Sequence, residues 1–309
     1  MAPARTNKHG DSEQVRPGSL QVWMMAVRPK TLSIAAVPVM VGNALAWSEV
    51  GVLDPLILLV TLISAIAIQA GTNLYNDAAD YLHGADQADR IGPVRVTAQG
   101  WVKPEQVKAA AMTAFAIAVF GGLYLSWIGG WVIVVIGLLS LLAGWGYSGG
   151  PRPIAYTPFG EVFVFCFFGV AAVSGSYYLQ AGAVSDSAPI AGGAIGLLAA
   201  AVLHVNNYRD REQDGRAGRR TLAVLVNDTG AKAIFALLMT VPFLVVLALF
   251  QSFPAAHGLW LVMAAALPAL LLVRQFWHEP VGPAFNGLLA GTAGTQALFA
   301  ILLCAGLLL

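Results

Sequence analysis

Residues 56–80 read LILLVTLISAIAIQAGTNLYNDAAD, a long apolar run whose end carries Asn and Asp side chains. About 20 consecutive apolar residues are enough to cross the hydrocarbon core of a bilayer as a helix. The stretch therefore predicts a transmembrane helix with carboxylates at one membrane surface.

Stretches of the same kind recur along the whole chain. Of its 309 residues, 58% are hydrophobic and 11% are charged, whereas soluble domains carry about 25% charged residues. We predict an all-α integral membrane protein with about nine transmembrane helices, formed as a single domain over 21–309 after a flexible cytoplasmic tail over 1–20. The predicted spans are roughly 31–48, 56–76, 106–127, 129–147, 159–181, 189–207, 231–251, 256–273 and 284–307.

The basic residues indicate how these spans are oriented. Alternate connections, near 49–55, 128, 182–188 and 252–255, contain no Lys or Arg, so all 17 basic residues fall on the other side. Basic loops stay in the cytoplasm. This asymmetry predicts a cytoplasmic N-terminus, an outside C-terminus and a multi-pass protein of the cytoplasmic membrane.

Charge and cysteine content argue against several other classes of protein. A net charge of +1 gives no field for nucleic acid, and Cys166 and Cys304 lie in apolar runs that form neither a disulfide scaffold nor a paired-Cys metal site. A transporter or channel is an alternative for a polytopic chain. Such proteins usually carry ionisable groups near the bilayer midplane, and several of the predicted spans have almost no interior charge.

Two polar stripes begin where spans two and six end, in long cytoplasmic loops near 77–105 and 208–230. If each helix continues into its loop, every stripe lies on one helix face. The stripes are Asn73, Asp77 and Asp80 at i, i+4, i+7, and Asn206, Asp210 and Asp214 at i, i+4, i+8. Asp77 and Asp210 stand 133 positions apart (210 − 77), as in an internal repeat.

Stacked carboxylates on one helix face repel one another, so a cation is expected between them. Mg²⁺ prefers oxygen ligands and usually binds through one or two carboxylates together with substrate phosphates. Arginines among the acids can balance the charge of a phosphate, and these are Arg90, Arg95, Arg209 and Arg219. The alternative is that the acids are solvated and simply pair with these arginines. Two clusters with matching spacing on one membrane face favour a site for Mg²⁺ and a diphosphate.

Four stretches resemble one known family. They are Arg28-Pro29-Lys30-Thr31-Leu32, Asn73–Arg95 with its Asp89-Arg90-Ile91-Gly92-Pro93 run, Tyr156–Glu161 with its Gly160-Glu161 pair, and Asn206–Leu222. Across nearly its whole length the chain resembles the UbiA-type superfamily of intramembrane aromatic prenyltransferases, most of all the branch that uses 1,4-dihydroxy-2-naphthoate. The resemblance implies nine helices around a central cavity that two cytoplasmic loops cover and that opens laterally to lipid.

The resemblance also implies roles for single residues. Asp86 departs from the family pattern, since many members carry a third aspartate at the position of Gly84. Arg219 stands where relatives often carry Lys. The implied Mg²⁺ ligands are Asp77, Asp80, Asp210 and Asp214, with Asp86 as a further candidate. The implied contacts to the diphosphate or to these ligands are Asn73, Asn76, Asn206, Arg90, Arg209 and Arg219.

The activity that follows from the resemblance is Mg²⁺-dependent transfer of a polyprenyl group from its diphosphate to 1,4-dihydroxy-2-naphthoate, with decarboxylation, giving demethylmenaquinone. The same chemistry on 4-hydroxybenzoate, homogentisate or a tetrapyrrole is the alternative, and the sequence leaves chain length and oligomeric state open. Candidate contacts to the aromatic acceptor are Arg28, Lys30, Tyr147, Arg152 and Tyr156, although Arg28 and Lys30 are equally ordinary at a helix entrance.

Two further polar residues lie inside predicted spans. His204, one turn before Asn206, is typical of a core histidine with a satisfied hydrogen bond more than of a general base. Glu161 stands where charge is expensive, so we expect it to pair with Arg152 or with a capping amide.

Overall fold

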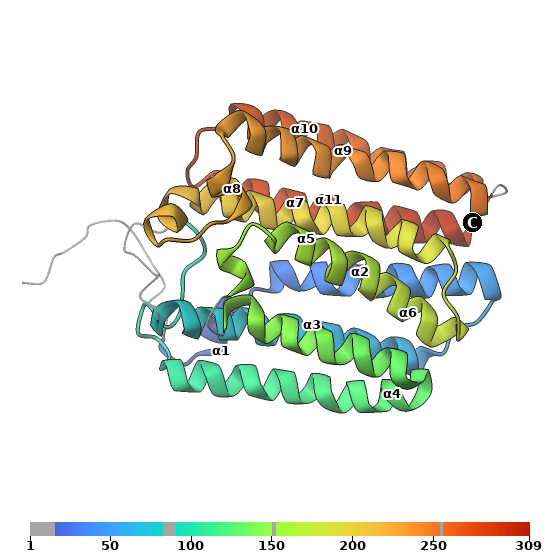
Figure 1. Ribbon diagram of the computed structural model, residues 1–309, viewed down its shortest axis with the longest axis horizontal. Helices are drawn as coiled ribbons and strands as arrows, with labels where there is room; N and C mark the ends of the chain where they lie inside the picture. The colour runs from blue at the N-terminus through green and yellow to red at the C-terminus, as the bar shows by residue number, and fades with distance from the viewer. Residues whose placement is uncertain (1–15, 83–90, 150–152, 254–255) are drawn as a thin grey trace, which may run out of the picture.

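The computed structural model describes residues 16–82, 91–149, 153–253 and 256–309, which form helices and no strand (Figure 1). Elements η1 and η3 are 3-10 helices, and η2 is a π-helix within the fifth predicted span. In chain order the elements are α1 (Leu20–Val27), α2 (Pro29–Val50), α3 (Pro55–Leu82), α4 (Pro104–Ser148), η1 (Ile154–Tyr156), α5 (Gly160–Phe165), η2 (Cys166–Ala171), α6 (Ala172–Ala181), α7 (Ser187–Arg216), α8 (Leu222–Leu225), α9 (Asp228–Ser252), η3 (His257–Ala265), α10 (Ala266–His278) and α11 (Phe285–Leu308).

The predicted all-α membrane fold is confirmed. Within the described ranges, 8 helical segments are long and apolar enough to cross a membrane. One of them, α4, has 45 residues, about twice the length that a bilayer requires. Gly130 interrupts it with φ 64° and ψ −155°, a conformation that is open almost only to glycine. The chain reverses there (Figure 1), so the predicted spans 106–127 and 129–147 are the two arms of α4.

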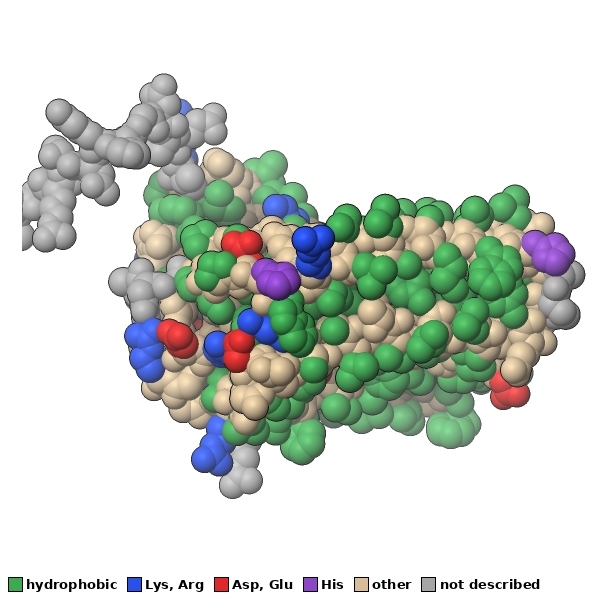
Figure 2. Space-filling model, turned by 90° about the horizontal axis from the view of Figure 1, so that it is seen from above, with side chains coloured by type: hydrophobic (Ala, Val, Ile, Leu, Met, Phe, Trp, Pro, Cys, Tyr) green, Lys and Arg blue, Asp and Glu red, His purple; other side chains and the backbone are tan. Residues whose placement is uncertain are grey.

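The long helices lie side by side along the long axis of the molecule (Figure 1). α1 and α8 lie at one end of this bundle, which is also where α3 and α7 finish. On the face in Figure 2, most charged side chains gather toward that end and hydrophobic ones predominate along the middle, while an acidic side chain and a histidine lie at the opposite end. Large apolar side chains of α4, such as Phe120, Trp127 and Trp131, are more than 70% exposed, as expected of a surface that faces lipid. The orientation across the membrane stays a prediction.

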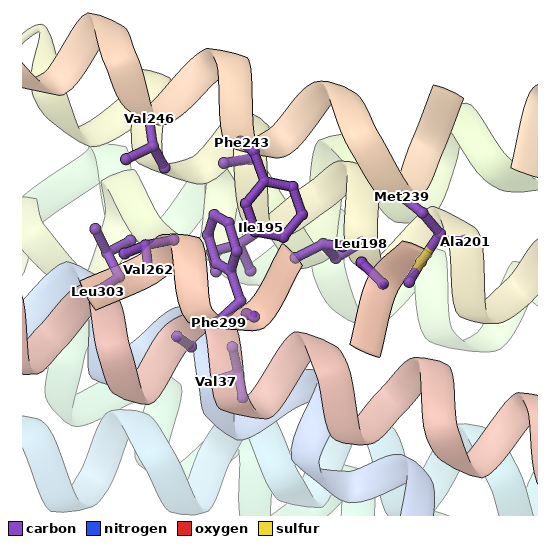
Figure 3. Close-up of a cluster of buried hydrophobic side chains, with 14 of the residues drawn as sticks. Val37, Ile195, Leu198, Ala201, Met239, Phe243, Val246, Val262, Phe299 and Leu303 are labelled. Carbon is purple, nitrogen blue, oxygen red and sulfur yellow. The ribbon is translucent and has the colours of Figure 1, made fainter. Parts of the chain in front are cut away.

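The main hydrophobic core lies around α7, on the side that faces α9 and α11. Figure 3 shows Phe243 of α9 and Phe299 of α11 beside Ile195 and Leu198 of α7. The two phenylalanine rings meet edge to face, with centroids 5.3 Å apart. This packing fixes α7, and therefore the acidic residues near its end, relative to the rest of the bundle.

Candidate functional site

The two predicted polar stripes lie on helices and meet at one end of the bundle. α3 continues to Leu82 and α7 to Arg216, so all six stripe residues are helical. Arg219 joins the stripes, because its Nη2 lies 2.9 Å from Asp80 Oδ1 and its Nη1 lies 3.2 Å from Asp214 Oδ1. Both carboxylates are buried. The cation expected between the stripes is, in this structure, a guanidinium.

The chain just after α7 places Arg219 in this position. Gly218 has φ +74°, the left-handed conformation that glycine adopts without strain, and it turns the chain back over the helix end. The Arg219 amide then donates to the Asp214 carbonyl at 2.9 Å. The guanidinium lies 4.4 Å from the centre of the Tyr156 ring. Burial lowers the pKa of Arg219, but Asp80 and Asp214 offset this and raise that pKa above its usual range, so the guanidinium is charged.

A second arginine holds the other oxygen of Asp80. Arg95 Nη2 lies 2.5 Å from Asp80 Oδ2 and 3.4 Å from Asn76 Oδ1. Arg95 is 4% exposed and lies in the segment between α3 and α4. The sequence predicted it as a phosphate-balancing arginine and did not indicate its contact with Asp80. Asp80 therefore receives two guanidinium groups from two different loops, one on each of its carboxylate oxygens.

Asp77 is fully buried, and its carboxylate is bound to the loop that carries Arg95. Its oxygens accept hydrogen bonds from the Val96 amide at 3.2 Å, the Thr97 amide at 3.1 Å and the Thr97 hydroxyl at 2.5 Å. A carboxylate has about four lone-pair sites, so three are already used. In this arrangement Asp77 fixes the turn that presents Arg95 to Asp80.

Asp210 is bound by its neighbour in the chain. Arg209 donates to both oxygens of Asp210 at 2.7 Å, and also to Asn206 and Asn286 at 2.8 Å. Asn286 stands in the first turn of α11 and also donates to the Ile91 carbonyl at 3.1 Å. No sequence pattern indicated Asn286, because a single amide at the start of an apolar span is common. It links the second stripe to the segment that follows the first one.

A cavity of about 230 Å³ begins beside these groups and extends between the helices. Its polar end includes Arg28, Asn73, Asn76, Tyr147 and Asn206. Most of the remaining lining is apolar, with Thr31, Gln69, Thr72 and Ser140 as further polar residues. The apolar lining includes Ile34, Ala35, Pro38, Ala65, Ile68, Phe163, Phe167, Phe168, Ala172, Ala199 and Leu203. Arg28 and Pro38 are ten positions apart (38 − 28), so the cavity follows α2 for about 15 Å.

The structure separates the predicted site residues into three groups. Asp80, Asp214 and Arg219 are joined directly. Asn73 is fixed to the junction of α1 and α2, because its Nδ2 donates to the Val27 carbonyl at 2.8 Å and to the Thr31 hydroxyl at 3.0 Å. Lys30 is exposed and does not line the cavity among the residues described. Asp86, Arg90 and Arg152 lie outside the described residues.

The donor set is compatible with Mg²⁺ bound together with a diphosphate. No group of three or more His, Cys, Asp or Glu side chains capable of holding a metal ion occurs in the part of the chain that the structure describes. Mg²⁺ that is shared with phosphate oxygens needs only one or two carboxylates. Asp80 and Asp214 already share one cation, Arg219, so their spacing suits a common positive partner.

Comparisons with known proteins place the chain in one group of membrane enzymes. A model of the UbiA prenyltransferase family matches residues 35–280. The 1,4-dihydroxy-2-naphthoate octaprenyltransferase of Escherichia coli (strain K12) is 36% identical over 294 residues, covering 91% of this chain and 94% of that protein. The protein of the same name from Bacillus subtilis (strain 168) is 32% identical over 306 residues, covering 99% and 98%.

A solved structure shows the same fold. A UbiA homolog from Archaeoglobus fulgidus bound to GPP and Mg²⁺ matches with a TM-score of 0.69 at 16% identity, over 93% of this chain and 100% of that chain.

Proposed function

The chain belongs to the UbiA prenyltransferase family, and we infer that it transfers a polyprenyl group from its diphosphate to 1,4-dihydroxy-2-naphthoate, with loss of the ring carboxylate, in menaquinone biosynthesis. The acceptor rests on the names of the bacterial relatives. Binding of the prenyl donor, the polyprenyl diphosphate, is supported by one structural observation. This is the bridge from Asp80 through Arg219 to Asp214, near the polar end of a largely apolar cavity. We place the protein in the cytoplasmic membrane.

We propose that the diphosphate binds where Arg219 now joins the two acidic stripes. Asp80 and Asp214 would hold Mg²⁺, with Asp77 and Asp210 as the further ligands that the family resemblance implies. Bound Mg²⁺ supplies positive charge for the departing diphosphate. Arg95 and Arg219 are placed to add hydrogen bonds to phosphate oxygens, which an arginine can bind in pairs. Asp86 and Arg90 remain candidates for the same site.

The polar end of the cavity supports binding of the diphosphate head, and its apolar part supports binding of the first isoprene units. Asn76 and Asn206 come from the two stripes and line the cavity at this end. Beyond them Phe163, Phe167 and Phe168 of α5 and η2 form an apolar wall. Apolar contact stabilises the prenyl chain by about 25 cal/mol per Å² that is removed from water. The same wall keeps water away from the allylic cation.

The acceptor is expected beside the same polar end. Tyr147 lines the cavity there, and Tyr156 stacks under the guanidinium of Arg219. Arg28 also lines the cavity, at the left-handed junction of α1 and α2 where its φ is 57°. We propose Tyr147 and Arg28 as acceptor contacts. Arg152 remains a candidate from the sequence.

The acceptor assignment is tested by offering two aromatic acids to the purified protein in detergent with Mg²⁺ and a polyprenyl diphosphate. Prenylated, decarboxylated product is expected by mass spectrometry from 1,4-dihydroxy-2-naphthoate and not from 4-hydroxybenzoate. Product from 4-hydroxybenzoate alone would keep the family and refute this acceptor. Absence of product from both, with folded protein, would refute the proposed function.

A further inference from the structure

One buried carboxyl group beside the cavity takes no part in the diphosphate site. Glu161 lies in the first turn of α5 and is 5% exposed. It stands three positions before Val164 on α5, so the two residues share one helix face, and Val164 lines the cavity. On its far side the Glu161 carboxyl meets His204 and Asn207 of α7.

The hydrogen bonds of His204 fix the number of protons in this cluster. His204 Nε2 lies 2.9 Å from the Ala231 carbonyl, which can only accept, so Nε2 carries a hydrogen. His204 Nδ1 lies 3.1 Å from Glu161 Oε1. A neutral imidazole with its hydrogen on Nε2 offers only a lone pair at Nδ1, and a carboxylate offers only lone pairs. One proton must therefore be shared between Nδ1 and Oε1.

The two oxygens of Glu161 differ in their contacts. Oε1 receives the shared proton and a hydrogen bond from Asn207 Nδ2 at 3.1 Å. Oε2 is buried and has no hydrogen-bond partner in the described part of the chain. Leaving a buried acceptor without a donor is unfavourable, so a hydrogen-bond donor on a bound ligand would stabilise this oxygen.

The neighbours of Glu161 place it near the polar end of the cavity. His204, whose imidazole is fully buried, occupies the side of Glu161 toward α9, where it meets Ala231. Tyr147 of α4 lies within electrostatic range of Glu161 and lines the polar end of the cavity. The other charged groups that act on Tyr147, and so face this region from α3, α7 and the segment after α7, are Asp80, Asp214 and Arg219.

We propose that Glu161 is the catalytic base for the aromatic acceptor, with Oε2 taking the proton of the ring hydroxyl while His204 holds the shared proton on Nδ1. The proposal rests on the proposed function. It assigns a residue to deprotonation of the aromatic acceptor, whereas the two acidic stripes are proposed to bind the diphosphate.

The proton balance of the reaction is compatible with a single base. As the ring carbon that carries the carboxylate bonds to the prenyl carbon, the bond from the prenyl carbon to diphosphate breaks and the hydroxyl proton moves to Oε2, which leaves a ring carbonyl. When CO₂ departs, its bonding electron pair returns to the ring and the carbonyl oxygen takes the proton back from Oε2. No net proton and no oxidant are needed, so the base needs no route to bulk water.

A purely structural ion pair explains the geometry less well. Buried ion pairs seldom stabilise a fold better than apolar residues of similar size, and a pair selected for packing would satisfy both carboxyl oxygens. The Glu161 side chain instead leaves Oε2 without a donor in the described part of the chain.

The test is Glu161→Gln, with Glu49→Gln as the matched control. Glu49 is also a hydrogen-bonded carboxyl, held by Tyr177 and Ser187 near the end of α2 that is remote from the polar stripes. Loss of a general base lowers turnover by about 100- to 10,000-fold. We expect such a fall in kcat for Glu161→Gln, an unchanged KM for the polyprenyl diphosphate, and near-normal activity for Glu49→Gln.

Two further readouts separate a base from a packing role. Glu161→Asp keeps the carboxyl and should recover at least tenfold over Glu161→Gln even if both variants are less stable. The kcat of Glu161→Gln should also rise with pH where that of the parent is flat, as more of the naphthol ionises without help. Folded Glu161→Gln within about threefold of the parent, or Glu161→Asp no better than Glu161→Gln, would overturn the proposal. If the parent protein itself fails to prenylate the naphthoate, the proposed function fails instead.

Discussion

Asp214→Asn is expected to lower prenyl transfer by about 100- to 1,000-fold while the protein stays folded in detergent. Asp214 is buried near the end of α7 and shares the Arg219 guanidinium with Asp80, so it is placed to share Mg²⁺ with a diphosphate in the same way. An amide keeps the shape of the side chain but removes the charge that the metal needs. Asp80→Asn should give a loss of the same size, measured as product formed per enzyme under saturating substrates.

Glu212→Gln is the control for this substitution. Glu212 lies on α7 two positions before Asp214, but its side chain is exposed. The same loss of charge there should change turnover by less than about twofold. Folded Asp214→Asn that keeps more than a tenth of the parent activity would remove Asp214 from the metal site.

Arg219→Ala is expected to destabilise the apo protein and to weaken binding of the diphosphate. Removing one partner of a buried ion pair costs about 3–5 kcal/mol, because the remaining charge stays buried. Here two carboxylates, Asp80 and Asp214, lose their common partner. We expect a lower Tm in detergent and a KM for the polyprenyl diphosphate raised by at least about tenfold. Mg²⁺ should restore part of the Tm, since it can take the place of the guanidinium.

Arg220→Ala provides the matched control, since Arg220 is the next residue and is exposed. Arg219→Lys should fall between Arg219→Ala and the parent, because an ammonium group cannot bind two carboxylates with the planar geometry of a guanidinium. A Tm for Arg219→Ala equal to that of Arg220→Ala would show that the bridge is not part of the stable fold.

The helical fold could be predicted because it depends on local sequence, and a shared site of the two stripes could be predicted because both have matching spacing and end a span on the same predicted membrane face. Long apolar runs define the spans, and the regular spacing from Asn73 to Asp80 persists when α3 continues past the apolar region. Eight residues are too few to show as an apolar run, so α1 escaped prediction. The sequence predicted a tight connection near residue 128 between the spans 106–127 and 129–147, and the structure places the break in α4 at Gly130.

The partners of the site residues could not be predicted, because they come from segments far apart in the chain. Asp77 binds the backbone of Val96 and Thr97, and a spacing rule within one helix contains no information about that loop. Glu161 meets His204, 43 positions away, whereas the sequence suggested Arg152 or a capping amide as its partner. Such pairings depend on how α5 packs against α7, which only the assembled core determines.

The central claim is that the two acidic stripes together form a Mg²⁺-dependent site for a diphosphate. The most direct measurement is calorimetric binding of a polyprenyl diphosphate to the parent protein in detergent, once with Mg²⁺ and once with excess chelator, without acceptor. The account predicts saturable binding with Mg²⁺ that weakens by at least about 100-fold with chelator, because buried Asp80 and Asp214 then face the phosphates without a metal between them. Equal affinity under both conditions would contradict it.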